Sequence, residues 1–137
     1  MMMTLGILGG GQLARMLCLD ARRMGVRTVV WSGDPTTEPT EGVADIVIKR
    51  KFDDEEAYDE FCRQVDVATV EFENIPRETL QKVEDAVGLF PSAESIAISQ
   101  HRSREKTFLR EHGIPCAPFI LVNSLEELKA AYQEVLY

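Results

Sequence analysis

The sequence predicts an α/β fold, with an open, parallel, doubly wound sheet that has helices on both faces and a helical segment after it. Short apolar runs alternate with amphipathic stretches over the first 91 residues, and a glycine-rich turn joins the first run to the first helix. After Pro91 the pattern changes to helices. We therefore expect a Rossmann-like domain over residues 1–91 and a helical linker that leads into a further domain over residues 92–137.

The first unit of this domain is a strand, a tight turn, a helix and a second strand. Residues 5–8 are apolar and stop at three consecutive glycines, which is typical of a buried strand that ends in a turn. Gly25 supplies a helix stop before the second strand at residues 28–31. Such a crossover implies parallel pairing. For the helix we expect an inward apolar stripe made of Leu13, Met16, Leu17, Ala21 and Met24.

The rest of the sheet follows from shorter signals. We expect further strands at residues 44–48, 67–70 and 89–90, after a loop at residues 32–42. Asp53 or Asp54 can cap the helix before the fourth strand, and Pro76 fits the first turn of the helix after it.

The last part of the chain is predicted as three helices and an extended segment at residues 119–122. Ser92 can cap a short helix that runs through Gln100, and residues 104–112 form a second helix. Residues 124–127 are a capping box that opens the last helix. In that helix we expect four inward residues: Leu125, Leu128, Tyr132 and Val135.

The composition disfavours several classes of function. The net charge of the 137 residues is −8 and no basic stripe is present, so neither nucleic acid nor a membrane surface is an expected partner. The three cysteines are widely spaced, without a CxxC pair or a Cys/His cluster, so we expect neither a disulfide framework nor a metal site. The start carries no targeting signal and no apolar run is of membrane-spanning length, which favours a cytoplasmic protein.

The glycine turn is the first candidate binding site. Residues 9–14 match the pattern G-x-G-x-x-[GA] between a strand and a helix, where exposed N–H groups and the helix dipole favour an anion. We expect Gly11, Gln12 and Leu13 to present those groups to a phosphate-bearing ligand. One alternative is a turn that binds nothing. Another is a dinucleotide site, with Asp34 near the ribose.

Two carboxylates form the second candidate site. Glu71 and Glu73 follow the strand at residues 67–70, at the edge of a parallel sheet where ligands bind. Alternation aims both side chains to one side, and close carboxylates demand a donor partner. The other interpretation is a solvated acidic turn that caps the next helix.

Four segments, in this order, resemble the N5-carboxyaminoimidazole ribonucleotide synthetase family of ATP-grasp enzymes. They are GILGGGQLARM at 6–16, TVEFENIP at 69–76, the stretch from PSAE at 91–94 to EKTFL at 105–109 with Arg102, and GIPCAPF at 113–119 with SLEEL at 124–128. Ala14 stands where the family often has glycine, and His101 stands where aspartate is common. The two lobes of the ATP-grasp domain are missing, apart from its first segment within residues 92–137.

The resemblance implies a function and a set of site residues. The whole enzyme uses ATP, with Mg²⁺, to join bicarbonate to the amino group of 5-aminoimidazole ribonucleotide in purine biosynthesis. Gly11, Gln12, Leu13 and Glu71 contact the ribonucleotide, with Glu73 as a weaker candidate, and Arg102 faces the phosphates of the nucleotide. The resemblance puts no catalytic residue and no metal ligand in this chain, so the chain alone is expected to be inactive.

Two other functions are kept beside this one. The chain could be the NAD(P)-binding Rossmann domain of an oxidoreductase, or a non-catalytic binding or dimerisation module; domains of this kind often contribute to a homodimer, which we expect here too. The ribonucleotide hypothesis requires Glu71 to lie close to Gln12, because one small ligand must reach both.

Overall fold

The structure, a computed structural model, describes residues 2–36 and 39–135 and divides into two units, Met1–Ala97 and Ile98–Tyr137. The first unit contains β1 (Thr4–Leu8), α1 (Gln12–Arg23), β2 (Arg27–Trp31), β3 (Ile46–Ile48), α2 (Glu55–Cys62), β4 (Val67–Val70), α3 (Arg77–Val87) and most of α4 (Ala93–Ser99). The second contains α5 (Arg102–Glu111) and α6 (Leu125–Val135).

A four-stranded parallel sheet forms the centre of the first unit, in the order β3-β2-β1-β4. The central strand β1 pairs with β2 on one side and with β4 on the other, so that Leu8 lies opposite both Trp31 and Val70. The carboxyl ends of these three strands therefore meet at one edge. The open, parallel, doubly wound sheet is confirmed.

The prediction of a fifth strand at residues 89–90 is wrong. Leu89 makes only a single parallel bridge with Ala68, and the side chain of Phe90 is 69% exposed. The chain then reaches Pro91, which has no N–H group to extend the ladder. One bridge therefore replaces a strand.

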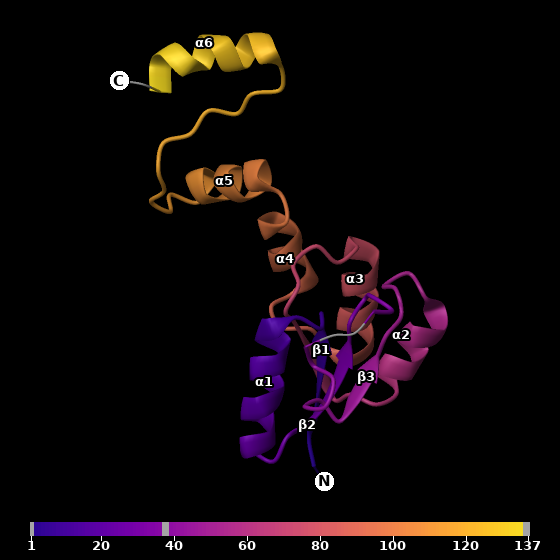
Figure 1. Cartoon of the computed structure of the whole chain (residues 1–137). Coiled ribbons are helices and arrows are strands. Elements are labelled where there is room, and N and C mark those ends of the chain that lie inside the picture. The colour runs from indigo at the N-terminus through magenta and orange to yellow at the C-terminus, as the bar shows by residue number, and fades with distance from the viewer. Residues whose placement is uncertain (1, 37–38, 136–137) are drawn as a thin grey trace. The chain divides into compact units, whose positions relative to one another are not determined.

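Helices cover both faces of the sheet (Figure 1), with α1 on one face and α2 and α3 on the other. The larger core lies under α2 and α3 and includes Trp31 and Phe61, whose rings are 5.8 Å apart. The smaller core lies under α1 and is built around Ile7, Cys18 and Val30. The sheet is thus held by two cores of unequal size.

The predicted inward stripe of α1 is wrong for most of its members. Leu13, Met16, Leu17 and Met24 are 40–77% exposed, while the buried residues are Ala14, Cys18 and Ala21. Both sets have helical spacing and share Ala21, but the buried stripe is rotated around the helix relative to the predicted one. Small side chains let the helix approach the sheet closely, so they take the contact and the larger apolar residues remain at the surface.

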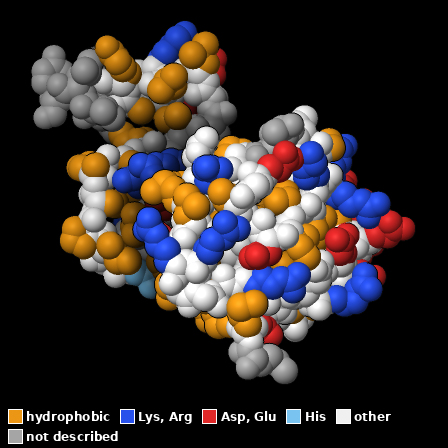
Figure 2. Space-filling view, turned by 60° about the horizontal axis from the view of Figure 1, so that its bottom comes forward, with side chains coloured by type: hydrophobic (Ala, Val, Ile, Leu, Met, Phe, Trp, Pro, Cys, Tyr) orange, Lys and Arg blue, Asp and Glu red, His pale blue; other side chains and the backbone are white. Residues whose placement is uncertain are grey.

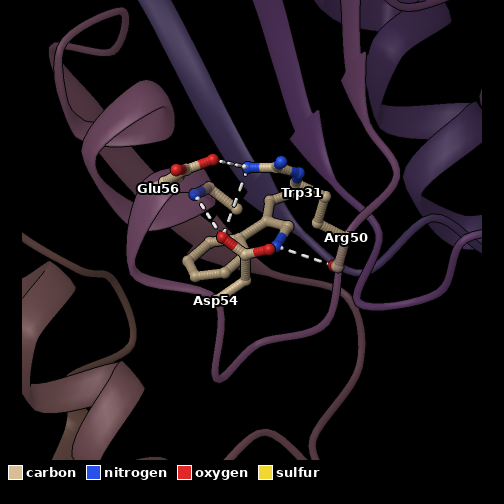
Figure 3. Close-up of polar contacts among 5 residues, drawn as sticks. Trp31, Arg50, Asp54 and Glu56 are labelled. Atoms are coloured by element: carbon tan, nitrogen blue, oxygen red, sulfur yellow. Dashed lines mark hydrogen bonds and ion pairs between the residues drawn. The ribbon is translucent and has the colours of Figure 1, made fainter.

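A hydrogen-bonded network holds the chain between β3 and α2 (Figure 3). The indole N–H of Trp31 donates to the carbonyl of Arg50 at 2.9 Å, and the Arg50 guanidinium pairs with Asp54 at 3.3 Å and with Glu56 at 2.9 Å. Asp54, one of the two predicted caps, accepts a hydrogen bond from the N–H of Ala57 at the start of α2. This network fixes the segment that carries Phe52.

The second unit has helices without a core. None of residues 98–132 is buried, and Leu125, Leu128 and Tyr132 of α6 are 50–60% exposed. Their predicted inward orientation is therefore wrong within this unit, and the side chain of Val135 lies outside the described residues. The cap itself forms, because Ser124 accepts a hydrogen bond from the N–H of Glu127 at 3.1 Å.

The surface mixes both signs of charge. On the face seen in Figure 2, acidic and basic side chains are interspersed with neutral and apolar ones. Among the residues that the structure describes, no helix combines the length and the apolar character needed to cross a bilayer.

Candidate functional site: a cleft at the carboxyl edge of the sheet

A cleft of about 360 Å³ lies where β1, β2 and β4 end. Open parallel sheets bind their ligands at this edge, because loops diverge there and helix N-termini point into the gap. The lining residues come from four segments that the sheet brings together: Gly9, Gly10, Gly11, Ser32, Gly33, Asp34, Phe52, Glu71 and Phe72.

The backbone at the end of β4 sets the position of Glu71. Its N–H donates to the carbonyl of Leu8 at 2.8 Å, so that residue 71 is held beside the start of the glycine turn. The side chain then turns toward α1, and its Oε2 atom accepts a hydrogen bond from the N–H of Gly11 at 3.2 Å. The carboxylate therefore lies at the N-terminus of α1, where the helix dipole stabilises negative charge.

Glycine at the two outer positions of the turn leaves room for this carboxylate. A Cβ atom on Gly11 would lie 2.5 Å from Glu71 Oε1, and one on Gly9 would lie 2.6 Å from Glu71 Oε2. Gly9 also has a φ of +108°, which side-chain-bearing residues rarely adopt. Glycine at both positions makes room for the acidic side chain.

Gln12 and Leu13 occupy the entrance of α1, as expected, and both side chains are exposed. Leu13 lines a second hollow, of about 380 Å³, which is next to the cleft because Glu71 lines both. The other residues of this hollow are Met16, Leu17, Asp20 and Val70. The structure thus brings Gly11, Gln12, Leu13 and Glu71 to one place, which the ribonucleotide hypothesis requires.

The other predicted site residues lie elsewhere. Glu73 is exposed and is not among the residues that line the cleft. Arg102 belongs to the second unit, at the first position of α5, where its side chain is 76% exposed and its guanidinium pairs with Glu105 at 2.6 Å.

Asp34, the candidate ribose ligand of the dinucleotide hypothesis, does line the cleft. Its carboxylate accepts a hydrogen bond from the N–H of Thr36 at 2.7 Å, and this bond lowers the pKa of the Asp34 carboxyl. One carboxylate oxygen of Asp34 is therefore engaged within its own loop.

The aromatic walls of the cleft were missed by sequence reasoning. Phe52 packs edge-on against Trp31, with ring centroids 5.3 Å apart, and Phe72 is 44% exposed directly after Glu71. Both follow the carboxyl end of a strand, as Glu71 does. Attention to all residues in the loops that follow the strands, rather than to charged ones alone, could have found them.

The fold and the cleft define a class of protein, an α/β domain with an open parallel sheet and a candidate ligand cleft at the carboxyl edge of that sheet. The chain belongs to the ribonucleotide synthetase preATP-grasp domain family, whose model matches residues 2–100. Within that family it is similar to N5-carboxyaminoimidazole ribonucleotide synthases, as that of Brucella melitensis shows, at 41% identity over 128 residues. That match covers 93% of this chain and 35% of the relative.

Another curated protein and two solved structures show the same similarity. The bifunctional purine synthesis protein purC/E of Dictyostelium discoideum is 40% identical over 135 residues, which are 98% of this chain and 13% of that protein. A solved N5-carboxyaminoimidazole ribonucleotide synthetase in complex with ADP superposes with a TM-score of 0.88 at 38% identity, over all of this chain and 37% of that one. An enzyme of the same kind from Aspergillus clavatus, bound to ADP and 5-aminoimidazole ribonucleotide, gives 0.82 at 30% identity, over 99% and 37%.

The chain spans about a third of the length of most of these relatives, and less of the bifunctional one. It corresponds to their N-terminal preATP-grasp region.

Proposed function

We propose that this chain is the ribonucleotide-binding part of an ATP-dependent ligase, which carboxylates 5-aminoimidazole ribonucleotide with bicarbonate to N5-carboxyaminoimidazole ribonucleotide in purine biosynthesis. The observation that carries the proposal is the Glu71 carboxylate, held by the Gly11 N–H in the cleft at the sheet edge. A solved relative at 30% identity that holds this ribonucleotide supports it.

The cleft can recognise a ribonucleotide through complementary polar groups. Glu71 has a second carboxylate oxygen, Oε1, which can accept from a ribose hydroxyl or from the amino group of the ligand. The exposed amide of Gln12 can both donate and accept at the entrance of α1. Phe52 and Phe72 add apolar walls on which a flat ring can lie.

ATP, Mg²⁺ and bicarbonate belong to the proposal for the whole enzyme. ATP would supply the activation of bicarbonate, and the ribonucleotide amine would capture the activated carbon. The exposed guanidinium of Arg102 suits phosphate oxygens, so we assign it to the nucleotide. We place the ligands of Mg²⁺ outside this chain, and we keep Glu73 as a secondary contact.

The organisation of the chain is proposed in the same way. Residues 1–91 form the substrate-binding domain, and residues 92–137 form the linker and the first segment of an ATP-grasp domain. We expect a cytoplasmic homodimer, and no synthetase activity from this chain alone.

Calorimetric titration of the purified chain tests the proposal directly. We expect 5-aminoimidazole ribonucleotide to bind weakly, with NAD⁺ giving no heat of binding, and Glu71→Gln to weaken the ribonucleotide about tenfold or more, because a charge-assisted acceptor is lost. Asp85→Asn is the matched control, since it removes one exposed carboxylate from α3, away from both hollows, and should leave the affinity unchanged.

Binding of NAD⁺ without binding of the ribonucleotide would favour the oxidoreductase hypothesis instead. If neither ligand binds and light scattering finds a dimer, the non-catalytic module is the better description.

A further inference from the structure

The glycine turn already holds an anion, and that anion belongs to the chain itself. Glu71 Oε2 accepts the hydrogen bond of the Gly11 N–H at 3.2 Å. The two carboxylate oxygens fill the space that a side chain on Gly9 or on Gly11 would occupy. In other strand–turn–helix units with this glycine pattern, a ligand phosphate takes such a place.

A second anion at the same N–H group would meet the carboxylate at close range. The two would compete for one donor, and like charges a few ångströms apart repel most strongly where water is partly excluded. Glu71 is half-buried between two hollows, so its charge is less screened than that of a carboxylate on the open surface. A phosphate can reach this turn only if Glu71 leaves it.

We propose that Glu71 determines specificity by excluding phosphate groups from the Gly9–Gly11 turn. The turn then selects a ligand that presents a hydrogen-bond donor to Glu71, with its phosphate directed elsewhere. A dinucleotide, whose pyrophosphate needs this turn, is rejected. Gly9 and Gly11 are positioning residues, because their missing side chains leave the room in which the carboxylate lies.

This inference deepens the proposed function, since it says which end of the ribonucleotide faces the turn, but the exclusion depends only on the geometry of this chain. The Glu71 side chain has two opposite effects in this proposal: it attracts a hydrogen-bond donor and repels an anion. A merely structural role for Glu71 would weaken every ligand together when the residue is changed.

Inorganic pyrophosphate is the probe for the excluded anion, and the amide signals of residues 10–13 in a ¹⁵N-labelled chain report where it binds. We expect no saturable shift at these amides in the unaltered chain. Glu71→Gln removes the charge and Glu71→Ala removes the carboxylate, and each should bind pyrophosphate at least about tenfold more tightly. The same variants should bind 5-aminoimidazole ribonucleotide more weakly.

Asp85→Asn serves as the control for net charge, because it removes one exposed carboxylate from α3, away from the turn and from both hollows. The proposal is overturned if the unaltered chain already binds pyrophosphate at these amides, if neither Glu71 variant gains affinity, or if Asp85→Asn gains as much. Melting followed by Trp31 fluorescence checks that the variants are folded, and the near-isosteric Glu71→Gln carries the test if Glu71→Ala is not.

Failure of the ribonucleotide to bind the unaltered chain would contradict the proposed function. The pyrophosphate result would still decide the exclusion, so the two proposals can fail separately.

Discussion

The two units of this chain use similar helices in different ways. In the first, amphipathic helices close two cores in which Trp31, Phe61 and Leu80 are fully buried. In the second, no residue between 98 and 132 is buried, although α6 has a good N-cap and apolar residues at helical spacing. Local signals are therefore enough to define a helix, whereas burial depends on what the rest of the chain offers to pack against it.

The largest expected difference between the units is in hydrogen exchange. The amides of β1 lie in the middle of the sheet, so we expect them to exchange only through global unfolding. Those of α6 should exchange by fraying, about a thousandfold faster or more. Exchange followed by mass spectrometry measures both, and equal protection of β1 and α6 would contradict the comparison.

The second largest difference is expected in the effect of removing a phenylalanine ring on the free energy of unfolding. Phe61→Ala opens a cavity in the larger core and should lower the free energy of unfolding by about 3–5 kcal/mol. Phe108→Ala is the matched control in α5, where the ring is half-buried and stacks on His112 at 4.0 Å, and it should cost less than about 1 kcal/mol. Urea unfolding followed by Trp31 fluorescence gives both values. A similar cost for the two changes would show that the second unit stabilises the first and unfolds together with it.

The reactivity of one cysteine thiol in each unit compares their burial directly. Cys18 is fully buried on the inner side of α1, and burial raises the pKa of its thiol, so less thiolate is present at any given pH. Cys116, in the second unit, is half-buried. With Ellman's reagent at pH 8, we expect Cys116 to react roughly tenfold faster or more than Cys18, each measured in a variant that keeps only that cysteine. The rate at Cys18 should rise on going to higher pH, and faster reaction at Cys18 would be evidence against its burial.

Helix caps should give the smallest difference. Asp54→Ala removes the cap of α2 and should lower the free energy of unfolding by about 1 kcal/mol, because α2 packs on the sheet. Ser124→Ala removes the cap of α6 and should reduce helical circular dichroism slightly, while the unfolding midpoint of Trp31 stays the same. A shift of that midpoint by Ser124→Ala would show that the units unfold together.

The sequence was sufficient to predict strand ends and helix caps, because these features depend on a few neighbouring residues. Three glycines after an apolar run gave the end of β1, and the boundaries of β4 were predicted at Val67 and Val70, as found. The cap of α2 was narrowed to two residues, of which Asp54 is the one used. Such features are local, so the chain around them specifies them.

Features that depend on strand register or on packing could not be predicted from the sequence. Periodicity showed an apolar stripe on α1, but the sheet prefers the small residues Ala14, Cys18 and Ala21, and only the assembled fold shows this preference. The bond between Glu71 and Gly11 joins residues 60 positions apart and follows from the pairing of Leu8 with Val70. Phe52 lines the cleft because the Arg50–Asp54 network holds its loop there.

The place of β1 in the sheet has a consequence for synthesis on the ribosome. It is the earliest of the four strands to be made, yet its two neighbours are β2 and β4. The sheet cannot close until Val70 has left the exit tunnel, so for more than 60 residues of elongation the apolar run at Leu5–Leu8 has an unpaired side. During that interval, the nascent strand is a natural substrate for chaperones that recognise short apolar segments.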